Sequence, residues 1–465
     1  MFRFPKGFAG WLFLAPGLSL MILWQLAPIF IAGYISVFRW HPVRGRFKGL
    51  DNYIDLIGEW GPGILFFSCL ALLIAGVWLL GQPVRAMTNH FRRYLIASIL
   101  ATSSAASLWS RNFLENAIAS FPTLEGSRPI RDFKRSTFEN WRGDEVEQLA
   151  LVQAASNHFG IWAIIFATLA LVFVFLPWKA LPKWVNQLSG AIVLVVATNG
   201  LAAAWARMII AGDDDFMASL VNTVFYSVGT VFTQITLGLV IAFGLYRKIR
   251  GDFIFRYLIF LPYITPVVGM ATVFSVIFRE RTSGLANRVA SLFDVGPFKW
   301  LSSEMPMMQA WFGLDWTGLA GGPTLGLISA ILFGVWSYTG YNAVILLAGL
   351  TSIPKDLYEA AEIDGASRSQ TFFKITLPLL SPVIFFLTLT GLIGTFQAFT
   401  HTFVLFERGA MRNESLIVAS IHVFQELRSG NFSSASAMGV LLFLLILLIT
   451  AAQFILAGRR LNSDL

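Results

Sequence analysis

The chain has 465 residues, of which 56% are hydrophobic and only 13% are charged, and its formal net charge is +8. Soluble domains carry about one quarter charged residues, so this composition excludes an ordinary soluble protein. The basic excess suits loops beside a membrane better than nucleic-acid binding. The single cysteine, Cys69, excludes an internal disulfide and a thiolate metal cage. The sequence therefore predicts an all-α polytopic membrane protein.

Apolar blocks along the chain are long enough to cross a bilayer, which takes about 20 residues per helix. The first block follows Arg3 and Lys6 and is longer than the core of a signal peptide, so we expect an uncleaved span. With this end in the cytoplasm, alternation places the short basic loops inside and the C-terminus in the cytoplasm as well. The predicted spans cover residues 10–37, 62–81, 94–110, 160–178, 189–210, 217–245, 254–278, 323–349, 379–400 and 436–457.

Two polar regions stand apart from these spans. Residues 111–158 carry many charges of both signs, and we expect them to form a loop or cap on the outer face. Three consecutive acids, Asp213 to Asp215, precede the span at 217–245. They fit a juxtamembrane anchor or a cation site, and no further ligand pattern surrounds them.

A polar segment at residues 357–378 lies between two long apolar runs, so it must sit at a membrane face. Pro354 can begin a helix that runs to Ile363, and Asp364-Gly365 is a turn signal because glycine adopts the positive φ that ends a helix. Ser367-x-x-Gln370 predicts a capping box that opens a second helix. We expect two short helices that form a rigid knob on the cytoplasmic side. Composition alone also fits an ordinary amphipathic connector.

The order Glu-Ala-Ala, Asp-Gly and Ile-x-Leu-Pro within residues 359–378 resembles the signature loop of membrane subunits in binding-protein-dependent ABC importers. A separate ATPase docks on that loop. The chain resembles in particular the sugar permeases of the maltose and glycerol-phosphate type, through further matches at residues 49–53, 219–223, 255–266, 349–354, 394–399 and 435–439. The resemblance implies an ATPase-docking surface made of Glu359, Ala360, Ala361, Glu362, Asp364, Gly365 and Arg368.

The resemblance also implies a domain organisation. Residues 1–58 would hold the first core helix and an outer segment, and 214–465 the other five helices of a six-helix permease core, with the docking loop at 352–378. Residues 59–213 depart from the family as an insertion of about four extra spans plus the outer loop at 111–158. The sequence leaves the role of this insertion open between a cap on the binding-protein interface, lipid binding, contact with a second permease and a peripheral structural addition.

Polar and small residues interrupt two of the predicted core spans. Lipid-facing polar groups are costly, so such residues are expected to face the bundle interior. Positions that match them line the sugar site in the maltose-type permease, whereas helix packing by small residues is the alternative interpretation. His401 fits a hydrogen-bonded structural residue or a proton relay. The substrate-path candidates are Tyr338, Thr339, Asn342, Gly394, Thr395, Gln397 and Ala398.

No Gly-x-x-x-x-Gly-Lys-Ser/Thr loop occurs, so any ATP hydrolysis belongs to another polypeptide. The resemblance implies a permease subunit, not an enzyme, without a cofactor or metal of its own. It would move a mono- or oligosaccharide across the bacterial cytoplasmic membrane by alternating access. The implied partners are a second permease subunit in a heterodimer, two ATPase subunits holding ATP and Mg, an extracytoplasmic sugar-binding protein and membrane lipid, with no nucleic acid.

Two other classes of protein fit the residues less well. An ion-coupled secondary transporter commonly buries acids near the middle of its spans, and the core spans here are nearly free of Asp and Glu. A polytopic membrane enzyme would need clustered His, Asp or Glu, whereas the five histidines are scattered over the chain. The importer is therefore the preferred interpretation, and the secondary transporter is the main alternative.

Overall fold

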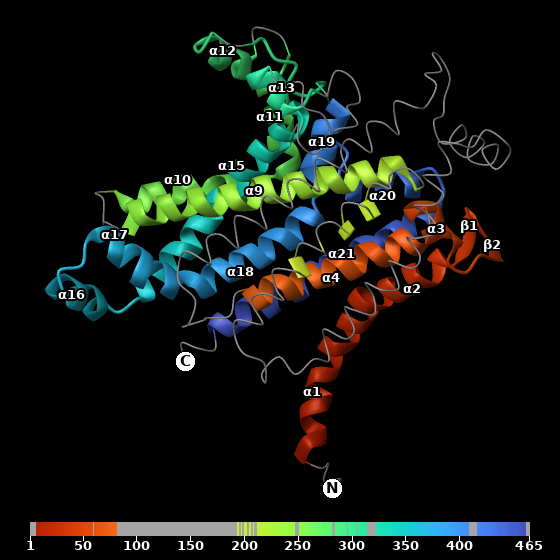
Figure 1. The fold of residues 1–465 in the computed structure, drawn as a ribbon, viewed down its shortest axis with the longest axis horizontal. Helices are drawn as coiled ribbons and strands as arrows, with labels where there is room; N and C mark the ends of the chain where they lie inside the picture. The colour runs from red at the N-terminus through yellow and green to blue at the C-terminus, as the bar shows by residue number, and fades with distance from the viewer. Residues whose placement is uncertain are drawn as a thin grey trace. The chain divides into compact units, whose positions relative to one another are not determined.

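The computed structural model folds into two compact units, residues 1–217 with 423–445 and residues 218–422 with 446–465. Nearly all of its regular elements are helices, as the composition predicts (Figure 1). Five helices among the described residues are long and apolar enough to cross a membrane, and two bent helix pairs raise that number to seven. The structure describes residues 6–58, 60–80, eight helical positions between 193 and 208, 212–246, 251–280, 284–294, 296–303, 305–313, 322–408 and 416–461.

The first unit begins with a long apolar helix whose winding changes partway. It consists of α1 (Lys6–Met21), a π-helical turn η1 (Ile22–Leu26) and α2 (Ala27–Ser36). Pro28 lacks an N–H and its ring would collide with the carbonyl four residues back, so the ladder loosens before it. The N–H of Ala27 accordingly donates to the oxygen of Ile22, five residues earlier. The stretch from 14 to 36 is a candidate span, which confirms the predicted first span.

An antiparallel hairpin follows α2 and is the only β-sheet among the described residues. It pairs β1 (Phe38–His41) with β2 (Val43–Phe47), and α3 (Asp51–Ile57) comes next. The buried Asn52 holds the base of the hairpin, because its Nδ2 donates to the oxygens of Ser36 (2.6 Å) and Phe38 (3.1 Å). The hydroxyls of Ser36 and Tyr53 lie 2.7 Å apart. The Gly49–Tyr53 motif thus fastens the hairpin to the end of the first span.

Helical structure is present at both ends of the predicted insertion, residues 59–213, where the structure describes it. The helix α4 (Trp60–Leu80) lies over the predicted span at 62–81, and the eight positions between 193 and 208 fall in the one at 189–210. Cys69 is fully buried in a small cluster with Leu65 and Ala204. The predicted spans 94–110 and 160–178 and the predicted loop 111–158 lie outside the described residues.

The first of the three consecutive acids, Asp213, directly precedes the long helix α9 (Asp214–Tyr246). The Oδ1 atom of Asp213 accepts a hydrogen bond from the N–H of Phe216 at 3.0 Å. A carboxylate in this position caps the first turn of a helix. No group of three or more His, Cys, Asp or Glu residues that could hold a metal ion occurs in the part of the chain that the structure describes. Asp213 therefore acts as a helix cap.

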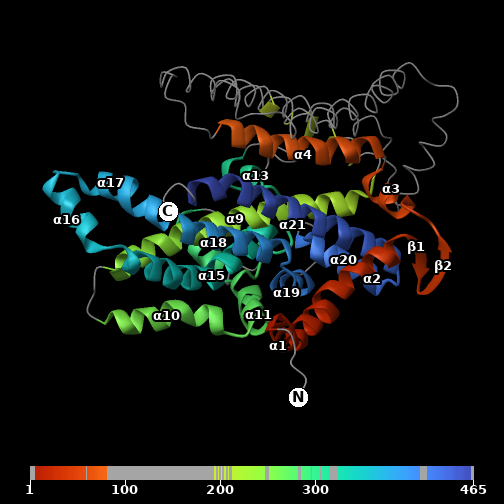
Figure 2. The same cartoon turned by 90° about the horizontal axis from the view of Figure 1, so that it is seen from below.

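The second unit contains the central membrane helices. Among the candidate spans, α15 (Leu325–Ser352) is the most buried, and α10 (Asp252–Ile264) and α18 (Leu377–Phe396) both pack against it (Figure 2). Helices match the predicted spans at 217–245, 323–349 and 379–400. The last predicted span, 436–457, lies within α21 (Phe432–Leu461), whose residues divide between the two units.

One predicted span is not a straight helix. The sequence predicts a single span at 254–278, but the structure has α10 and α11 (Val267–Ile277), which are bent by 94° (Figure 1). The break falls at Thr265, whose backbone is extended. A residue before proline is pushed out of the helical region, and Pro266 follows directly. The two helices together are long and apolar enough for one broken span, so the span at 254–278 stays a prediction, and the bend at Thr265 is a feature that apolar length does not reveal.

Shorter helices complete the second unit: α12 (Leu285–Ser291), α13 (Met307–Phe312), α19 (Thr400–Arg408) and the first residues of α20 (Ala419–Arg428). Two polar side chains from the start of α9 fix the segment before α20. Asn222 donates to the oxygen of Ile417 at 3.1 Å, and Thr223 Oγ1 accepts from the N–H of Ala419 at 2.9 Å. The Ser-Leu-Val-Asn-Thr motif thus ties α9 to a segment nearly two hundred residues later.

Close packing of α10 on α15 yields a stability prediction. A Cβ atom added at Gly340 would overlap the carbonyl oxygen and carbon of Ile259. Gly340→Ala is expected to destabilise the protein by about 1–3 kcal/mol, because backbone atoms cannot move aside as a flexible side chain can. Thermal unfolding in detergent measures this change. Gly269→Ala is the matched control, because nothing lies within 4 Å of its added Cβ, and an equal loss in both variants would contradict the packing argument.

Candidate functional site

The polar segment between α15 and α18 begins with a short helix, α16 (Lys355–Ile363). Its predicted bounds are confirmed at both ends. The helix ends in a Schellman motif, in which the N–H of Ala366 donates to Ala361 (2.9 Å) and the N–H of Gly365 to Glu362 (3.0 Å). Gly365 has a φ of +70°, which a residue with a Cβ rarely adopts. The predicted Asp-Gly turn is therefore confirmed.

The predicted capping box is also present. The N–H of Gln370 donates to Ser367 Oγ at 3.3 Å, and the N–H of Ser367 donates to Gln370 Oε1 at 2.8 Å. These two bonds satisfy amide groups that a helix start leaves unpaired. The box opens α17 (Arg368–Thr371).

The second helix differs from its prediction because it does not end before the membrane. α17 passes through a π-helical turn, η2 (Phe372–Thr376), directly into α18. Pro378 loosens the ladder there as Pro28 does in the first span, and Leu377 donates to the oxygen of Phe372. The hydroxyl of Tyr358 on α16 lies 3.2 Å from Thr376 Oγ1. The segment thus consists of one separate short helix, α16, which contacts the start of the long helix formed by α17, η2 and α18.

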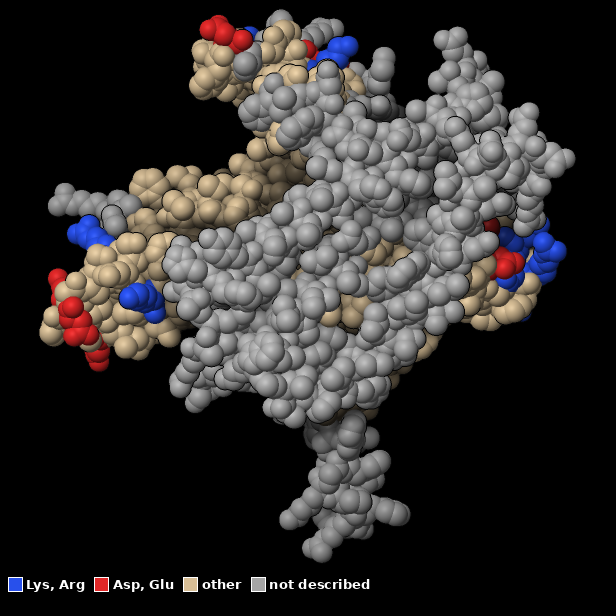
Figure 3. All heavy atoms as spheres, in the orientation of Figure 1, with Lys and Arg blue, Asp and Glu red and all other residues tan. Residues whose placement is uncertain are grey.

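The docking candidates lie mostly on the surface. Glu359, Ala360, Glu362, Asp364, Gly365 and Arg368 are exposed, whereas Ala361 is buried. Figure 3 shows acidic side chains gathered over α16, and both ribbon views show α16 extending beyond the ends of α15 and α18. Ile363, which lies between Glu362 and Asp364 in the sequence, is 86% exposed. Such a surface, with an exposed apolar side chain between acidic neighbours in the sequence, suits a basic groove on another protein.

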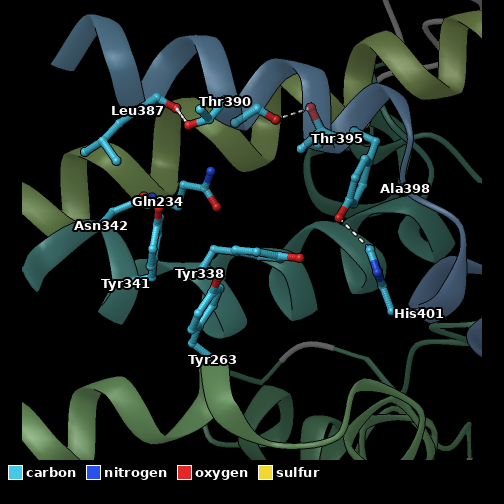
Figure 4. A pocket seen from close by; sticks show the side chains of 13 residues that line it. Gln234, Tyr263, Tyr338, Tyr341, Asn342, Leu387, Thr390, Thr395, Ala398 and His401 are labelled. Carbon is cyan, nitrogen blue, oxygen red and sulfur yellow. Dashed lines mark hydrogen bonds between the residues drawn. The ribbon is translucent and has the colours of Figure 1, made fainter. Parts of the chain in front are cut away.

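A cavity of about 200 Å³ lies among the helices of the second unit (Figure 4). Its walls come from α9, α10, α15, α18 and α19, so five separate parts of the chain must be in place to form it. The lining residues are Tyr226, Gln234, Tyr263, Tyr338, Tyr341, Asn342, Leu387, Thr390, Gly391, Gly394, Thr395, Ala398 and His401.

Three tyrosines form an aromatic wall on one side of the cavity. The rings of Tyr263 and Tyr341 are stacked with centroids 4.7 Å apart, and the ring of Tyr338 meets Tyr263 edge-on at 5.8 Å. α10 contributes one of these residues and α15 the other two (Figure 4). Ring faces of this kind offer apolar contact area together with hydroxyl groups at their rims.

Two amides in the cavity wall have hydrogen-bonding atoms without a partner among the residues that the structure describes. Gln234 and Asn342 are each only 3% exposed, and neither Gln234 Oε1 nor Asn342 Nδ2 is hydrogen-bonded. Buried polar groups normally find partners, because an unpaired one costs about 1–3 kcal/mol. A molecule that can both donate and accept hydrogen bonds would therefore satisfy the unpaired acceptor of Gln234 and the unpaired donor of Asn342.

His401 closes one end of the cavity. Its Nε2 lies 2.6 Å from the hydroxyl of Tyr226, and its ring stacks on Phe333 with centroids 5.2 Å apart. His401 lies on α19, outside the candidate spans, and burial lowers the pKa of its imidazole to about 4. The ring is therefore neutral near pH 7. This geometry favours the hydrogen-bonded structural histidine over the proton relay.

The structure brings five of the seven substrate-path candidates to the cavity and leaves two outside. Thr339 is buried but donates to the oxygen of Val335, and Gln397 is exposed at the end of α18. The candidates that line the cavity are Tyr338, Asn342, Gly394, Thr395 and Ala398. Gln234 and Tyr263 were missed, although an amide inside an apolar helix was a visible signal for the first.

Comparison with known proteins bears on the same part of the chain. Residues 234–462 match the family model "Binding-protein-dependent transport system inner membrane component". The arabinooligosaccharides transport system permease protein AraP of Halalkalibacterium halodurans is 31% identical over 251 residues, which are 54% of this chain and 73% of that protein. The trehalose/maltose transport system permease protein MalF of Thermococcus litoralis is 30% identical over 297 residues, 63% of this chain and 90% of that protein.

A solved structure is similar as well. A chain in the crystal structure of a bacterial alginate ABC transporter, in complex with an alginate pentasaccharide-bound periplasmic protein, is 21% identical with a TM-score of 0.44. The similarity covers 53% of this chain and 80% of that one.

The family match takes in the polar segment at 357–378, and it takes in the cavity wall from Gln234 onward. It confirms the resemblance first visible in the 359–378 motif. Proteins of this family are the permease subunits, in which a partner ATPase handles ATP. The chain is therefore a multi-pass membrane protein that belongs to the binding-protein-dependent transport system inner membrane components, as a permease subunit of an ABC importer.

Proposed function

We propose that the chain carries a carbohydrate, a mono- or oligosaccharide, from an extracytoplasmic binding protein into the cytoplasm through the cavity between α9, α15 and α18. The observation that carries this proposal is the pairing of an aromatic wall with unpaired amides. Sugar rings have an apolar face that stacks on tyrosine, and their hydroxyl groups both donate and accept hydrogen bonds. None of the described residues that line the cavity has a charged side chain at pH 7, which favours a neutral solute over an ion.

The relatives support the same class of cargo. AraP is named for the transport of arabinooligosaccharides, and MalF for that of trehalose and maltose. The volume of about 200 Å³ is below the roughly 300–1,000 Å³ typical of small-molecule sites. In this conformation the cavity therefore suits one ring of a sugar chain, and a longer cargo would enter ring by ring as the helices move.

The coupling to ATP would run through the docking segment. In this proposal α16 binds in a groove of a cytoplasmic ATPase. Both termini of the chain are also cytoplasmic. A second permease subunit and a second ATPase complete the transporter. The core consists of six helices in 1–58 and 214–465, and residues 59–213 are an addition to it. Movement of the ATPase pair would then open the cavity alternately to each side of the membrane.

A pair of glutamine variants tests the cavity as the substrate path. The complete transporter, reconstituted in liposomes with its binding protein, is assayed for uptake of labelled arabinooligosaccharides, trehalose and maltose. Gln234→Leu is expected to lower uptake of the transported sugar about tenfold, because a lost hydrogen bond in a buried site costs about 1–1.5 kcal/mol.

Gln397→Leu is the matched control, because Gln397 is exposed and does not line the cavity. Its uptake should stay near the wild-type rate. Equal uptake in both variants would show that the substrate path lies elsewhere. If the wild-type transporter takes up none of these sugars, the cargo assignment is contradicted, whereas the family assignment is unaffected.

A further inference from the structure

The hairpin after the first span carries a basic surface that the transport function does not use. We define the basic hairpin as β1 and β2 with the exposed side chains of Arg39, Arg44 and Arg46. None of these arginines pairs with a carboxylate in the part of the chain that the structure describes, where Lys48 and Asp55 form the ion pair at 3.4 Å. Figure 3 shows basic side chains gathered over the hairpin.

The basic hairpin is held in a fixed shape. The guanidinium of Arg44 lies over the ring of Phe38 at 4.3 Å, and over that of Tyr34 at 5.4 Å. His41 Nδ1 lies 2.7 Å from the oxygen of Gly430, and Asn52 fastens the other end of β1. A side chain that is already positioned loses less entropy when it binds an anion.

The hairpin must lie at the membrane surface. β1 begins at Phe38, two residues after α2 ends, and α2 completes a candidate span. Its position therefore depends only on the first span and not on the identity of the cargo. Under the proposed orientation this is the extracytoplasmic side, where juxtamembrane arginines are not expected from the usual bias.

Apolar side chains accompany the arginines. Val43 is 75% exposed at the tip, and Phe47 is 67% exposed on β2. Tyr34 and Trp40 stand beside them with ring centroids 6.5 Å apart. Tyrosine and tryptophan collect at the level of lipid headgroups, and a surface that combines basic and apolar residues lies in the interface. A partner in the aqueous phase that contacts only the arginines would leave Val43 and Phe47 in water.

We propose that the basic hairpin rests on the bilayer and binds the phosphates of anionic phospholipid headgroups through Arg39, Arg44 and Arg46. Arginine suits this ligand because its planar guanidinium can donate two parallel hydrogen bonds to one phosphate. The exposed Val43 and Phe47 enter the interfacial layer beside those headgroups. The hairpin thereby fixes the outer end of the first span relative to the lipid surface.

A nitroxide at the tip reports on this contact. Val43→Cys is labelled in the full transporter, and the unlabelled wild type serves as the background because Cys69 is buried. The complex is placed in nanodiscs of phosphatidylcholine with increasing fractions of phosphatidylglycerol. We expect the collision rate of the nitroxide with oxygen to rise, relative to a water-soluble nickel complex, as the anionic lipid increases. High salt should weaken this response.

Two triple variants separate charge from folding. The midpoint is the fraction of phosphatidylglycerol at which the rise in oxygen accessibility is half complete. Changing Arg39, Arg44 and Arg46 together to Gln should raise this midpoint at least about fivefold, which corresponds to the loss of one arginine contact, or abolish the rise. The same three changes to Lys should retain the rise, because the charge remains. The control Arg288→Gln, an exposed arginine on α12, should behave as the wild type.

Three results would overturn the proposal. The first is equal accessibility of the nitroxide in both kinds of lipid. The second is an unchanged midpoint in the Gln variant. The third is a label that becomes immobile only when the purified binding protein is added, which would make the basic hairpin a protein-docking surface. None of these results depends on uptake, so a wrong cargo assignment would not affect the test.

Discussion

Glu359→Lys is expected to release the ATPase from the transporter and to stop uptake. Glu359 is exposed on α16 within a group of acids, and the proposed groove of the ATPase is basic. Reversing the charge would set a lysine against that groove and leave a buried basic partner unpaired, which costs about 2–5 kcal/mol. Co-purification of the ATPase subunit with the tagged permease measures the association, and uptake in liposomes measures the coupling.

The control for this prediction is Glu407→Lys, which reverses an exposed acid at the end of α19. The ATPase subunit should still co-purify with the tagged permease in that variant. Retention of the ATPase at wild-type yield in the Glu359 variant would show that α16 is not the docking helix. The interpretation of the segment as an ordinary connector would then be correct.

Gly394→Leu is expected to close the substrate path while leaving the fold intact. An added Cβ at Gly394 has no atom within 4 Å, and this residue lines the cavity. The new side chain would therefore extend into the space that the sugar ring needs. Uptake should fall at least tenfold, which corresponds to about 1.4 kcal/mol. The ATPase should remain bound, because the docking segment is untouched.

Gly17→Leu is the comparison variant, since Gly17 in α1 also has open space around its added Cβ and does not line the cavity. We expect normal uptake there. Normal uptake in the Gly394 variant as well would mean that cargo does not pass between α15 and α18. Thermal unfolding of both variants in detergent would show whether either change acts through stability.

The local structure of the 357–378 segment could be predicted closely from the sequence because its signals are local. The Schellman turn depends on Gly365, and the capping box on Ser367 and Gln370, all within six residues. Each motif satisfies backbone groups that its own helix leaves unpaired, so tertiary context has little to override. The continuation into α18 was missed, because the π-helical turn before Pro378 absorbs the proline without ending the helix.

The bend at Thr265 and the hairpin at 38–47 were harder to predict. An apolar run of sufficient length predicts a span but says nothing of its straightness. The hairpin depends on Asn52, whose amide reaches back to Ser36 and Phe38. Such contacts join residues that are more than ten positions apart, so periodicity alone does not reveal them.

The cavity was predicted only in part, for a related reason. Tyr338 and Asn342 could be found because they interrupt one helix at helical spacing. Gln234 and Tyr263 come from other helices, and only the packed bundle shows that they meet the same space. Thr339 illustrates the opposite error, because its hydroxyl turns back to the helix backbone. Facing residues on separate helices therefore require tertiary information.

The unbroken passage from α17 into α18 makes this helix a lever. The Tyr358–Thr376 contact joins α16 to the end of this helix that the proposed orientation places in the cytoplasm, and Thr395 in the cavity wall lies near the other end. The 20 residues of α18 span about 30 Å, so a tilt of roughly 5° would displace the far end by roughly 3 Å. That displacement is comparable to the width of a hydroxyl group, enough to make or release the hydrogen bonds that hold a sugar. A small stroke at the ATPase would thus be read out at the cargo.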